Sequence, residues 1–224
     1  MKISIVEARP TKKHLRYMAL DREINRTDGY LVKKGMWEIM QRQQIVFDFF
    51  SHLEQEYDQQ SSRVEVFEGG SGIGNALHQL KTGIDRPELQ IRGLEKKIRT
   101  TGSTLSKEHL QSADRGSVDE MIVGPIEKYE FKQQYDFVFD FNGAVFYFPD
   151  EIVPVYKRIL KPGKKAFLRF FTGSFTLNSK KDWNLLKIYT ESQKKIQRLL
   201  DHNGFKIIDY DGDRFFNSDY LVEH

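Results

Sequence analysis

The sequence predicts an α/β protein, built on a mostly parallel sheet with helices on both faces, from three observations. From residue 63 onward, apolar runs of strand length alternate with segments of helical periodicity. A glycine-rich turn follows the first of these runs. The run at 135–141 is apolar along nearly its whole length, which is typical of a strand covered on both faces.

Composition narrows the class of protein. The chain has 224 residues, enough for one α/β domain with a small appendage, and 13% of them are aromatic, which supplies bulk for a core. Cysteine is absent from the sequence, which excludes disulfides, thiolate metal sites and a cysteine nucleophile. Charges interrupt the first residues, and no apolar run approaches the roughly 20 residues of a membrane span. We therefore expect a soluble, cytoplasmic protein with no membrane span.

The glycine-rich turn is the first functional signal. A buried strand leads into Glu68-Gly69-Gly70-Ser71-Gly72-Ile73-Gly74, and a helix follows over 75–80. Glycine lets a ligand approach peptide N–H groups that a Cβ would shield, and the helix directs its positive end to the same place. Asn75 stands where a dinucleotide fingerprint needs its third glycine, and no Gly-Lys-Ser/Thr follows as in a P-loop. The pattern predicts a nucleotide-type site at the carboxyl end of the first strand.

Two other strands are expected to end beside this turn. Residues 88–95 read as a second strand that ends on Glu95, whose two carboxylate oxygens can accept both hydroxyls of a ribose. The strand at 135–141 ends with the polar groups of Asp140 and Asn142. Because the carboxyl ends of parallel strands share one edge of a sheet, these side chains are expected to surround the ligand.

The remaining elements follow from periodicity and from turn residues. Residues 1–62 are expected to form an N-terminal helical extension or cap, and 63–224 the ligand-binding domain. The first part of the chain is expected to hold a helix over 36–57, and 99–120 to be an irregular polar stretch around a short helix at 107–111. A third strand at 120–123 and a helix at about 150–160 follow, and Lys161-Pro162-Gly163 stops that helix. The last elements expected are a strand at 166–171, a helix over 182–203, a strand at 205–210, a hairpin turn at Asp211-Gly212-Asp213 and a last strand at about 214–222.

Together, these features resemble the class I S-adenosylmethionine-dependent methyltransferases over residues 63 to 210. The segment 68–74 looks like the first motif of that family, and Gly93-Leu94-Glu95 looks like the acidic end of its second strand. Tyr135-Asp136-Phe137-Val138, followed by Arg158-Ile159-Leu160-Lys161-Pro162-Gly163, looks like its fourth strand and the turn before its fifth. The resemblance implies a seven-stranded, Rossmann-like sheet whose last strand is antiparallel.

The resemblance also implies S-adenosylmethionine as the cofactor and a set of binding residues. Gly70, Gly72 and Gly74 would face its methionine part, with Glu68 supporting the turn. Glu95 would take the ribose hydroxyls and Lys96 would border the adenine. The full set implied for the cofactor is Glu68, Gly69, Gly70, Ser71, Gly72, Gly74, Glu95, Lys96, Ile126, Glu127, Asp140, Phe141 and Asn142. One departure concerns the adenine, because Pro125-Ile126 stands where the family often has an acid, and Glu127 or a backbone carbonyl would have to substitute.

The expected activity is methyl transfer to a small molecule or to a protein side chain. A general base is needed only if the nucleophile is still protonated, and Asp140 is the first candidate, followed by Asp150 and His14. Candidate substrate residues are Tyr30, Trp37, Tyr147 and Ser174, although Tyr30 and Trp37 also suit a helix that only packs on the sheet. No Asn/Asp-Pro-Pro-Tyr/Phe follows the fourth strand, which argues against methylation of adenine or glutamine nitrogens. No metal site is predicted.

A competing hypothesis comes from the charges. Residues 157–198 hold 12 Lys/Arg against only Asp182 and Glu191. A concentrated basic surface is what binding to nucleic acid requires, although a lysine-rich helix face is more often only solvated. The alternative is therefore a methyltransferase-like binding module, or a nucleic-acid methyltransferase, that uses this segment as its contact surface.

Overall fold

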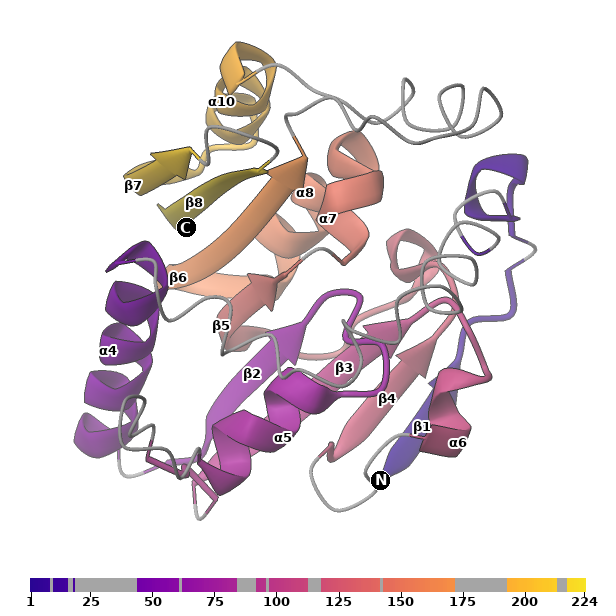
Figure 1. Cartoon of the computed structure of the whole chain (residues 1–224), viewed down its shortest axis with the longest axis horizontal. Helices are drawn as coiled ribbons and strands as arrows, with labels where there is room; N and C mark the ends of the chain where they lie inside the picture. The colour runs from indigo at the N-terminus through magenta and orange to yellow at the C-terminus, as the bar shows by residue number, and fades with distance from the viewer. Residues whose placement is uncertain are drawn as a thin grey trace, which may run out of the picture.

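A computed structural model of the chain describes residues 1–8, 10–15, 18, 44–60, 62–83, 92–95, 97–112, 118–141, 143–171, 193–212 and 217–224. They form one eight-stranded sheet with helices on both faces (Figure 1). The strands are β1 (Lys2–Ile5), β2 (Val64–Glu68), β3 (Ile98–Thr104), β4 (Glu120–Val123), β5 (Tyr135–Asp140), β6 (Leu160–Phe171), β7 (Lys206–Gly212) and β8 (Asn217–Glu223). The helices are α4 (Gln44–Gln59), α5 (Asn75–Thr82), α6 (His109–Ser112), the 3₁₀-helix η1 (Ile126–Lys128), α7 (Ala144–Tyr147), α8 (Pro149–Ile159) and α10 (Gln193–His202).

The strand order is β1-β4-β3-β2-β5-β6-β8-β7. The neighbouring strands from β1 to β6 pair in parallel, and β8 lies antiparallel between β6 and β7. The chain first builds the sheet outward from β2 to β3 and β4, and then returns to place β5 and β6 on the other side of β2. The carboxyl ends of β2 and β5 therefore meet at a topological switch point, where open α/β sheets bind ligands.

The predicted fold class is confirmed, with one strand more than the seven expected. The additional strand is β1, which pairs in parallel with β4 at one edge of the sheet (Figure 1). Lys2 lies opposite Glu120 in this pair. The sequence Lys2–Ile5 is too short and too close to the chain start for its alternation to stand out. Residues 1–62 thus contribute a strand as well as helix, and their separation from 63–224 as a unit stays a prediction.

Two apolar clusters fill the space between the sheet and its helices. One joins α4 and α5 to one face, and the other joins α7, α8 and α10 to the opposite face. Helix α4 buries Ile45, Val46, Phe49, Phe50 and Leu53, which recur at helical spacing, and it packs on β6, β7 and β8. The prediction of a long packing helix is confirmed over α4, and residues 36–43 of that prediction lie outside the described residues.

We expect Phe49→Leu to lower the free energy of unfolding by about 1–2 kcal/mol, because the smaller side chain leaves a gap in the core. Phe49 is fully buried and its ring meets Phe137, Phe139 and Phe167 of the sheet. Phe47→Leu on the same helix is the control, because Phe47 is 62% exposed and the change should leave stability unaltered. Urea denaturation of both variants measures the difference, and equal effects would show that α4 does not dock as described.

The second strand of the prediction is placed wrongly. The strand is Ile98–Thr104, so Glu95 precedes its amino end instead of closing its carboxyl end. The stretch that we expected to be irregular is a buried strand, and the hydroxyls of Thr100, Ser103 and Thr104 form hydrogen bonds there. Thr100 Oγ1 donates to Asp119, for example, at 3.2 Å. Threonine favours strands, but five small or polar residues in succession hide the apolar signal on which the prediction relied.

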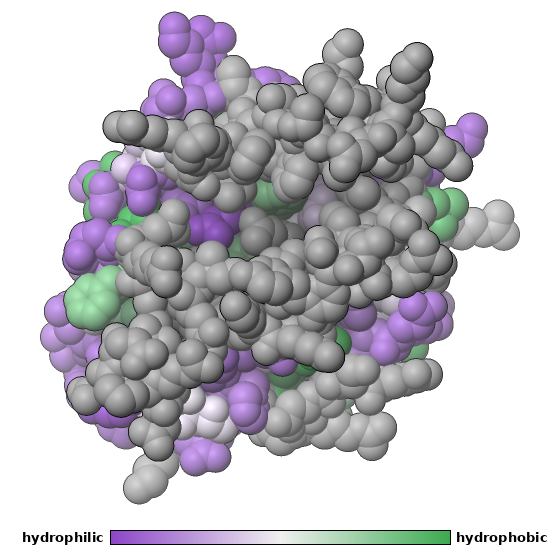
Figure 2. All heavy atoms as spheres, in the orientation of Figure 1, coloured by the Kyte–Doolittle hydropathy of each residue, from purple (hydrophilic) through white to green (hydrophobic). Residues whose placement is uncertain are grey.

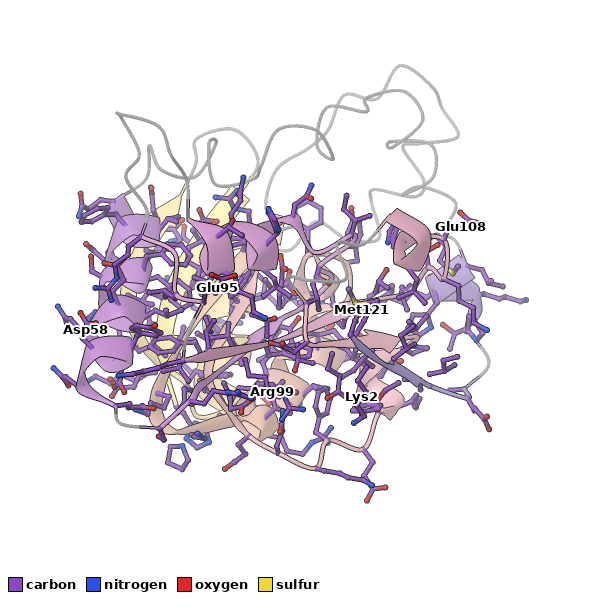
Figure 3. The ribbon with its side chains drawn as sticks, turned by 90° about the horizontal axis from the view of Figure 1, so that it is seen from below. Lys2, Asp58, Glu95, Arg99, Glu108 and Met121 are labelled. Carbon is purple, nitrogen blue, oxygen red and sulfur yellow. The ribbon has the colours of Figure 1, made fainter. Side chains whose placement is uncertain are left out.

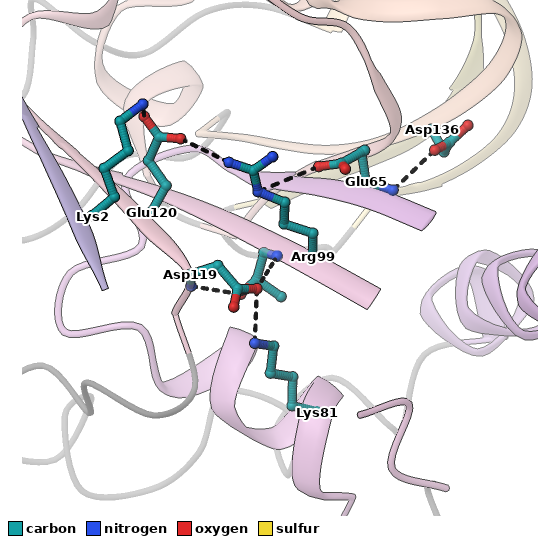
Figure 4. Close-up of polar contacts among 8 residues, drawn as sticks. Lys2, Glu65, Lys81, Arg99, Asp119, Glu120 and Asp136 are labelled. Atoms are coloured by element: carbon teal, nitrogen blue, oxygen red, sulfur yellow. Dashed lines mark hydrogen bonds and ion pairs between the residues drawn. The ribbon is translucent and has the colours of Figure 1, made fainter. Parts of the chain in front are cut away.

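Ion pairs connect side chains at the amino ends of β1, β2, β3 and β4, on the face of the sheet opposite α5. Lys2 Nζ lies 3.0 Å from Glu120 Oε1, and Arg99 reaches both Glu120 (3.5 Å) and Glu65 (3.9 Å) (Figure 4). The Glu65 backbone N–H donates to Asp136 Oδ2 at 2.9 Å. Figure 3 shows Arg99 and Lys2 on one side of the sheet and Glu95 on the other. These opposite charges neutralise one another at the end of the sheet away from the glycine-rich turn.

The described surface is mainly hydrophilic on the face shown in Figure 2, with apolar side chains in small separate groups. In the described part of the chain, no helix is both long enough and apolar enough to cross a membrane.

Candidate cofactor site

The glycine-rich turn closes the carboxyl end of β2, as predicted, and leads into α5. Gly70, Gly72 and Gly74 have φ of 64°, 56° and 84°, in the left-handed region that favours glycine. Backbone hydrogen bonds fix the turn to both neighbouring strands. Gly69 N donates to the carbonyl of Phe139 on β5 at 2.9 Å, and Ser71 N donates to the carbonyl of Ser103 on β3 at 2.7 Å. The turn is therefore part of the rigid sheet edge.

The glycines of this turn serve different purposes. A Cβ on Gly69 would overlap the Tyr156 hydroxyl, and a Cβ on Gly70 would overlap Gly143. A Cβ on Gly74 would lie 2.6 Å from a methyl group of Val118. Among the described residues, no atom lies within 4 Å of the position that a Cβ on Gly72 would take. Three of the glycines are therefore required by packing within the protein, and Gly72 is the one whose missing side chain leaves open space.

Asp140, the last residue of β5, lies beneath the turn. It is fully buried, and its carboxylate accepts hydrogen bonds from Gly143 N (2.6 Å), Val145 N (2.8 Å) and Tyr156 Oη (2.5 Å). Burial raises the pKa of Asp140 to about 7, against the effect of these donors, which favour the ionised form. A sealed carboxylate with three donors cannot reach a substrate. The structure therefore contradicts the prediction of Asp140 as general base.

Glu68 supplies a second buried carboxyl group at the same place. Its side chain is 4% exposed, and its Oε2 has no hydrogen-bond partner among the described residues. Burial, and to a lesser degree the charge of Asp140, raise the pKa of Glu68 well above its ordinary value. The predicted position of Glu68 at the end of the strand is confirmed, and the turn has an unsatisfied polar atom beside it.

The carboxyl end of β3 holds residues that the sequence prediction missed. Thr104 closes the strand, and its Oγ1 lies 2.7 Å from His109 Nδ1 and accepts a hydrogen bond from Ser106 N at 3.2 Å. Glu95 is exposed and precedes the amino end of β3, so the structure does not bring it to the glycine turn at the carboxyl end of the sheet. Lys96 lies outside the described residues. The β-branched threonines from 100 to 104 were the signal that could have located the strand.

The carboxyl end of β4 leads into η1, where Glu127 is already paired. His14 Nε2 lies 3.2 Å from Glu127 Oε1, and His14 Nδ1 accepts a hydrogen bond from Thr11 N at 3.1 Å. Burial acts to raise the pKa of Glu127, but hydrogen bonds from His14 and from its own backbone outweigh burial and hold it below its ordinary value. Ile126 is buried in the core. Because both ring nitrogens of the buried His14 are engaged, the structure contradicts its role as general base.

Other candidate residues are dispersed. Asp150 lies in the exposed first turn of α8, with its carboxylate 3.8 Å from Lys195. Tyr147 is 8% exposed and belongs to the core, which contradicts its placement on a substrate wall. Phe141 is buried against Phe139 and Phe167. Besides Lys96, four predicted site residues lie outside the described residues, namely Tyr30, Trp37, Asn142 and Ser174.

Carboxylates from elsewhere in the chain meet much of the basic segment 157–198. Within the described residues, the ion pairs are Lys161–Asp136, Lys164–Glu56, Lys165–Glu223, Arg169–Asp219 and Lys195–Asp150. None of these acids lies inside the segment, so its local excess of positive charge overstates the charge of the folded surface. This pairing weakens the case for a nucleic-acid contact surface there.

The described residues also contain a hollow that lies away from the glycine turn. A hollow of about 400 Å³ lies between α4 and the β7–β8 hairpin, and His52 and Ile208 are among its lining residues. The described residues include no cluster of three or more side chains suited to hold a metal ion.

Solved structures with the same arrangement place this site in a known fold. The chain resembles an S-adenosylmethionine-dependent methyltransferase from Clostridium acetobutylicum (13% identity, 92% of this chain and 98% of that chain, TM-score 0.59). It also resembles the magnesium protoporphyrin IX methyltransferase of Synechocystis, solved with bound S-adenosylhomocysteine (16% identity, 95% and 98%, TM-score 0.58). The chain therefore has the class I methyltransferase fold, as the sequence resemblance implied.

A third similar structure is phosphoethanolamine N-methyltransferase 2 of Haemonchus contortus, in complex with S-adenosylmethionine (18% identity, 73% of this chain, TM-score 0.53). The match spans only 38% of the length of that enzyme. No model of a known sequence family matches the chain, and no protein of curated function matches it.

Proposed function

We propose that the protein is an S-adenosylmethionine-dependent methyltransferase that acts on a small molecule or, as the second choice, on a protein side chain. The observation that carries the proposal is the open space at Gly72. It lies in a rigid turn at the carboxyl end of β2, at the switch point of a sheet with the methyltransferase strand order. The similar solved structures are methyltransferases that act on different substrates, so they support methyl transfer in general. The class of molecule that accepts the methyl group is our inference.

The described residues fit the cofactor in two respects. The cradle at Gly72 is one that a Cβ would fill, because no described atom lies within 4 Å of the position that the Cβ would take. The unpartnered Glu68 Oε2 is an acceptor that an ammonium group could satisfy. The turn from Gly69 to Gly72 would hold the methionine part, and the carboxyl ends of β3 and β4, at Thr104–Ser106 and Pro125–Ile126, would border the ribose and adenine. Phe141 and Asn142 stay part of this proposal, whereas Glu95 and Lys96, which precede the amino end of β3 in the sequence, do not.

The cofactor supplies a methyl group on a positively charged sulfur, so the chemical demand on the protein is small. The protein would chiefly bind, align and desolvate the reactants, and alignment alone can contribute roughly 7–11 kcal/mol to a reaction of this kind. Asp140 and His14 are both buried, and hydrogen bonds within the protein already engage their polar atoms. Neither side chain would therefore accept a proton from the substrate. An acceptor whose nucleophile is unprotonated at neutral pH would need no base.

Calorimetric titration with S-adenosylhomocysteine tests the proposal. We expect saturable binding with one site per chain and a dissociation constant in the micromolar range. NAD is the control ligand, because the missing third glycine of a dinucleotide fingerprint predicts no binding. No heat of binding at millimolar S-adenosylhomocysteine would overturn the proposal. Binding without transfer of a labelled methyl group to any of a panel of small molecules and peptides would favour the binding-module alternative.

A further inference from the structure

We propose that Tyr156 on α8 is a positioning residue, which holds the glycine turn in its cofactor-binding shape by acting through Asp140. This inference rests on the function proposed above. Tyr156 itself is fully buried and has no atom within 4 Å of the position that a Cβ on Gly72 would take. Its role would be to fix the shape of the site.

The hydrogen bonds connect α8 to the segment that follows β5. The Tyr156 hydroxyl donates to Asp140 Oδ2 at 2.5 Å, an oxygen that also accepts from Val145 N at 2.8 Å. The second oxygen, Oδ1, accepts from Gly143 N at 2.6 Å. One carboxylate thus joins α8 to the peptide N–H of Gly143 in the loop after β5 and to the peptide N–H of Val145 in α7. Removing the hydroxyl would release one of the three ties.

Close contacts carry this arrangement into the glycine turn. At Gly69 a Cβ would overlap the Tyr156 hydroxyl and would lie 2.7 Å from Asp140 Oδ2, so the turn rests directly on this pair. A Cβ on Gly143 would overlap the carbonyl of Gly69, and one on Gly70 would overlap Gly143. The loop after β5 and the turn after β2 are therefore packed in direct contact, without free space between them. Because of this close packing, a shift of Asp140 must move the backbone of the turn.

The Tyr156 hydroxyl also stabilises the ionised form of Asp140. Among the described residues, the titratable groups that face Asp140 are Glu68 from β2 and Tyr156 from α8. Burial raises the pKa of Tyr156 well above its ordinary value, so the phenol keeps its proton and remains a donor. Burial raises the pKa of Asp140 to about 7, and the Tyr156 hydroxyl is foremost among the groups that act to lower it. Loss of the hydroxyl should therefore raise the pKa of Asp140 further.

The pH dependence follows from these signs. Asp140 accepts its hydrogen bonds best as a carboxylate, and it becomes protonated as the pH falls through about 7. We expect the affinity for S-adenosylhomocysteine to fall between pH 8 and pH 6. In Tyr156→Phe this fall should begin at a higher pH, because Asp140 then binds its proton more readily. A residue that only fills the core would not move this profile.

The experiment compares Tyr156→Phe with Tyr135→Phe by calorimetric titration with S-adenosylhomocysteine from pH 6 to pH 9. Both tyrosines are buried in the same core cluster and contact Phe67, but Tyr135 lies at the amino end of β5, away from the turn. At pH 8 we expect Tyr156→Phe to weaken binding roughly tenfold, the scale of one hydrogen bond to a charged group. Tyr135→Phe should keep the wild-type affinity and the wild-type pH profile, even if it lowers stability.

The outcomes separate the two proposals. Absence of binding by the wild-type protein would overturn the proposed function itself. Wild-type binding together with an unchanged affinity and pH profile in Tyr156→Phe would overturn the role of Tyr156. If Tyr156→Phe does not fold, Asp140→Asn provides the test, because an amide keeps the shape but cannot titrate. Its affinity for S-adenosylhomocysteine should be low throughout pH 6 to 8, and a wild-type affinity at pH 8 would overturn the inference.

Discussion

Gly72→Asn should lower the affinity for S-adenosylhomocysteine at least about a hundredfold, a loss of roughly 2.7 kcal/mol in binding free energy. The space beside Gly72 is open, so the new side chain would occupy the volume that the cofactor needs. Asparagine tolerates the left-handed backbone better than other side chains, and the φ of 56° at Gly72 can therefore be kept. Calorimetric titration measures the affinity, and circular dichroism checks that the fold is retained.

Gly163→Asn is the matched control for this prediction. Gly163 also has a left-handed φ, of 72°, and a Cβ there would likewise meet nothing within 4 Å. It lies near the amino end of β6, at the opposite end of the sheet from the turn. The control should bind S-adenosylhomocysteine as the wild-type protein does. Wild-type affinity in Gly72→Asn would show that the cofactor does not occupy this turn, and equal losses in both variants would point to a general effect of the substitution.

Asp219→Ala should reduce the free energy of unfolding by about 3–5 kcal/mol, because it leaves a buried guanidinium group without its carboxylate. Asp219 on β8 stands directly opposite Arg169 on β6. Two hydrogen bonds join them, from Arg169 Nε (2.6 Å) and from its terminal nitrogen (2.5 Å), and the two side chains are 1% and 6% exposed. Urea denaturation followed by fluorescence measures the loss.

Two further variants decide whether burial is the cause. Asp58→Ala removes a carboxylate that lies 2.6 Å from Arg92, but both of those side chains are more than half exposed, and we expect no resolvable change. The double variant Arg169→Met with Asp219→Leu replaces both charges by apolar groups and should recover most of the stability that the single change loses. If Asp219→Ala is as harmless as Asp58→Ala, the pair is not buried in solution.

Local pattern was sufficient wherever a short stretch of sequence contains its own structural cause. The turn at 69–74 could be predicted because glycine is needed for its left-handed backbone. The strand β5 followed from its apolar run, and the end of α8 followed from Lys161-Pro162-Gly163. The hairpin of β7 and β8 followed from two strand-like runs, although Asp211 and Gly212, which were predicted as part of its turn, belong to β7. These elements define the fold class and locate the candidate site at the end of β2.

Partners that are distant in sequence decided the rest. In the polar strand β3, Asp119 pairs with the Thr100 hydroxyl and Gly70 N with the Ser103 hydroxyl, and the sequence of β3 contains no sign of those partners. The displacement of that strand by several residues carried Glu95 from the carboxyl edge to the amino edge of the sheet. In the same way, β1 is a strand because β4 lies beside it.

The sequence by itself determined the class of fold, the glycine-rich turn and the acid that precedes it. Only the tertiary structure decided which glycine faces open space, and that Asp140 and His14 are buried supports instead of bases. It also decided that acids elsewhere in the chain neutralise much of the basic segment. The physical reason is that backbone conformation depends on neighbouring residues, whereas burial, hydrogen bonding and charge pairing depend on groups that only folding brings within a few ångströms.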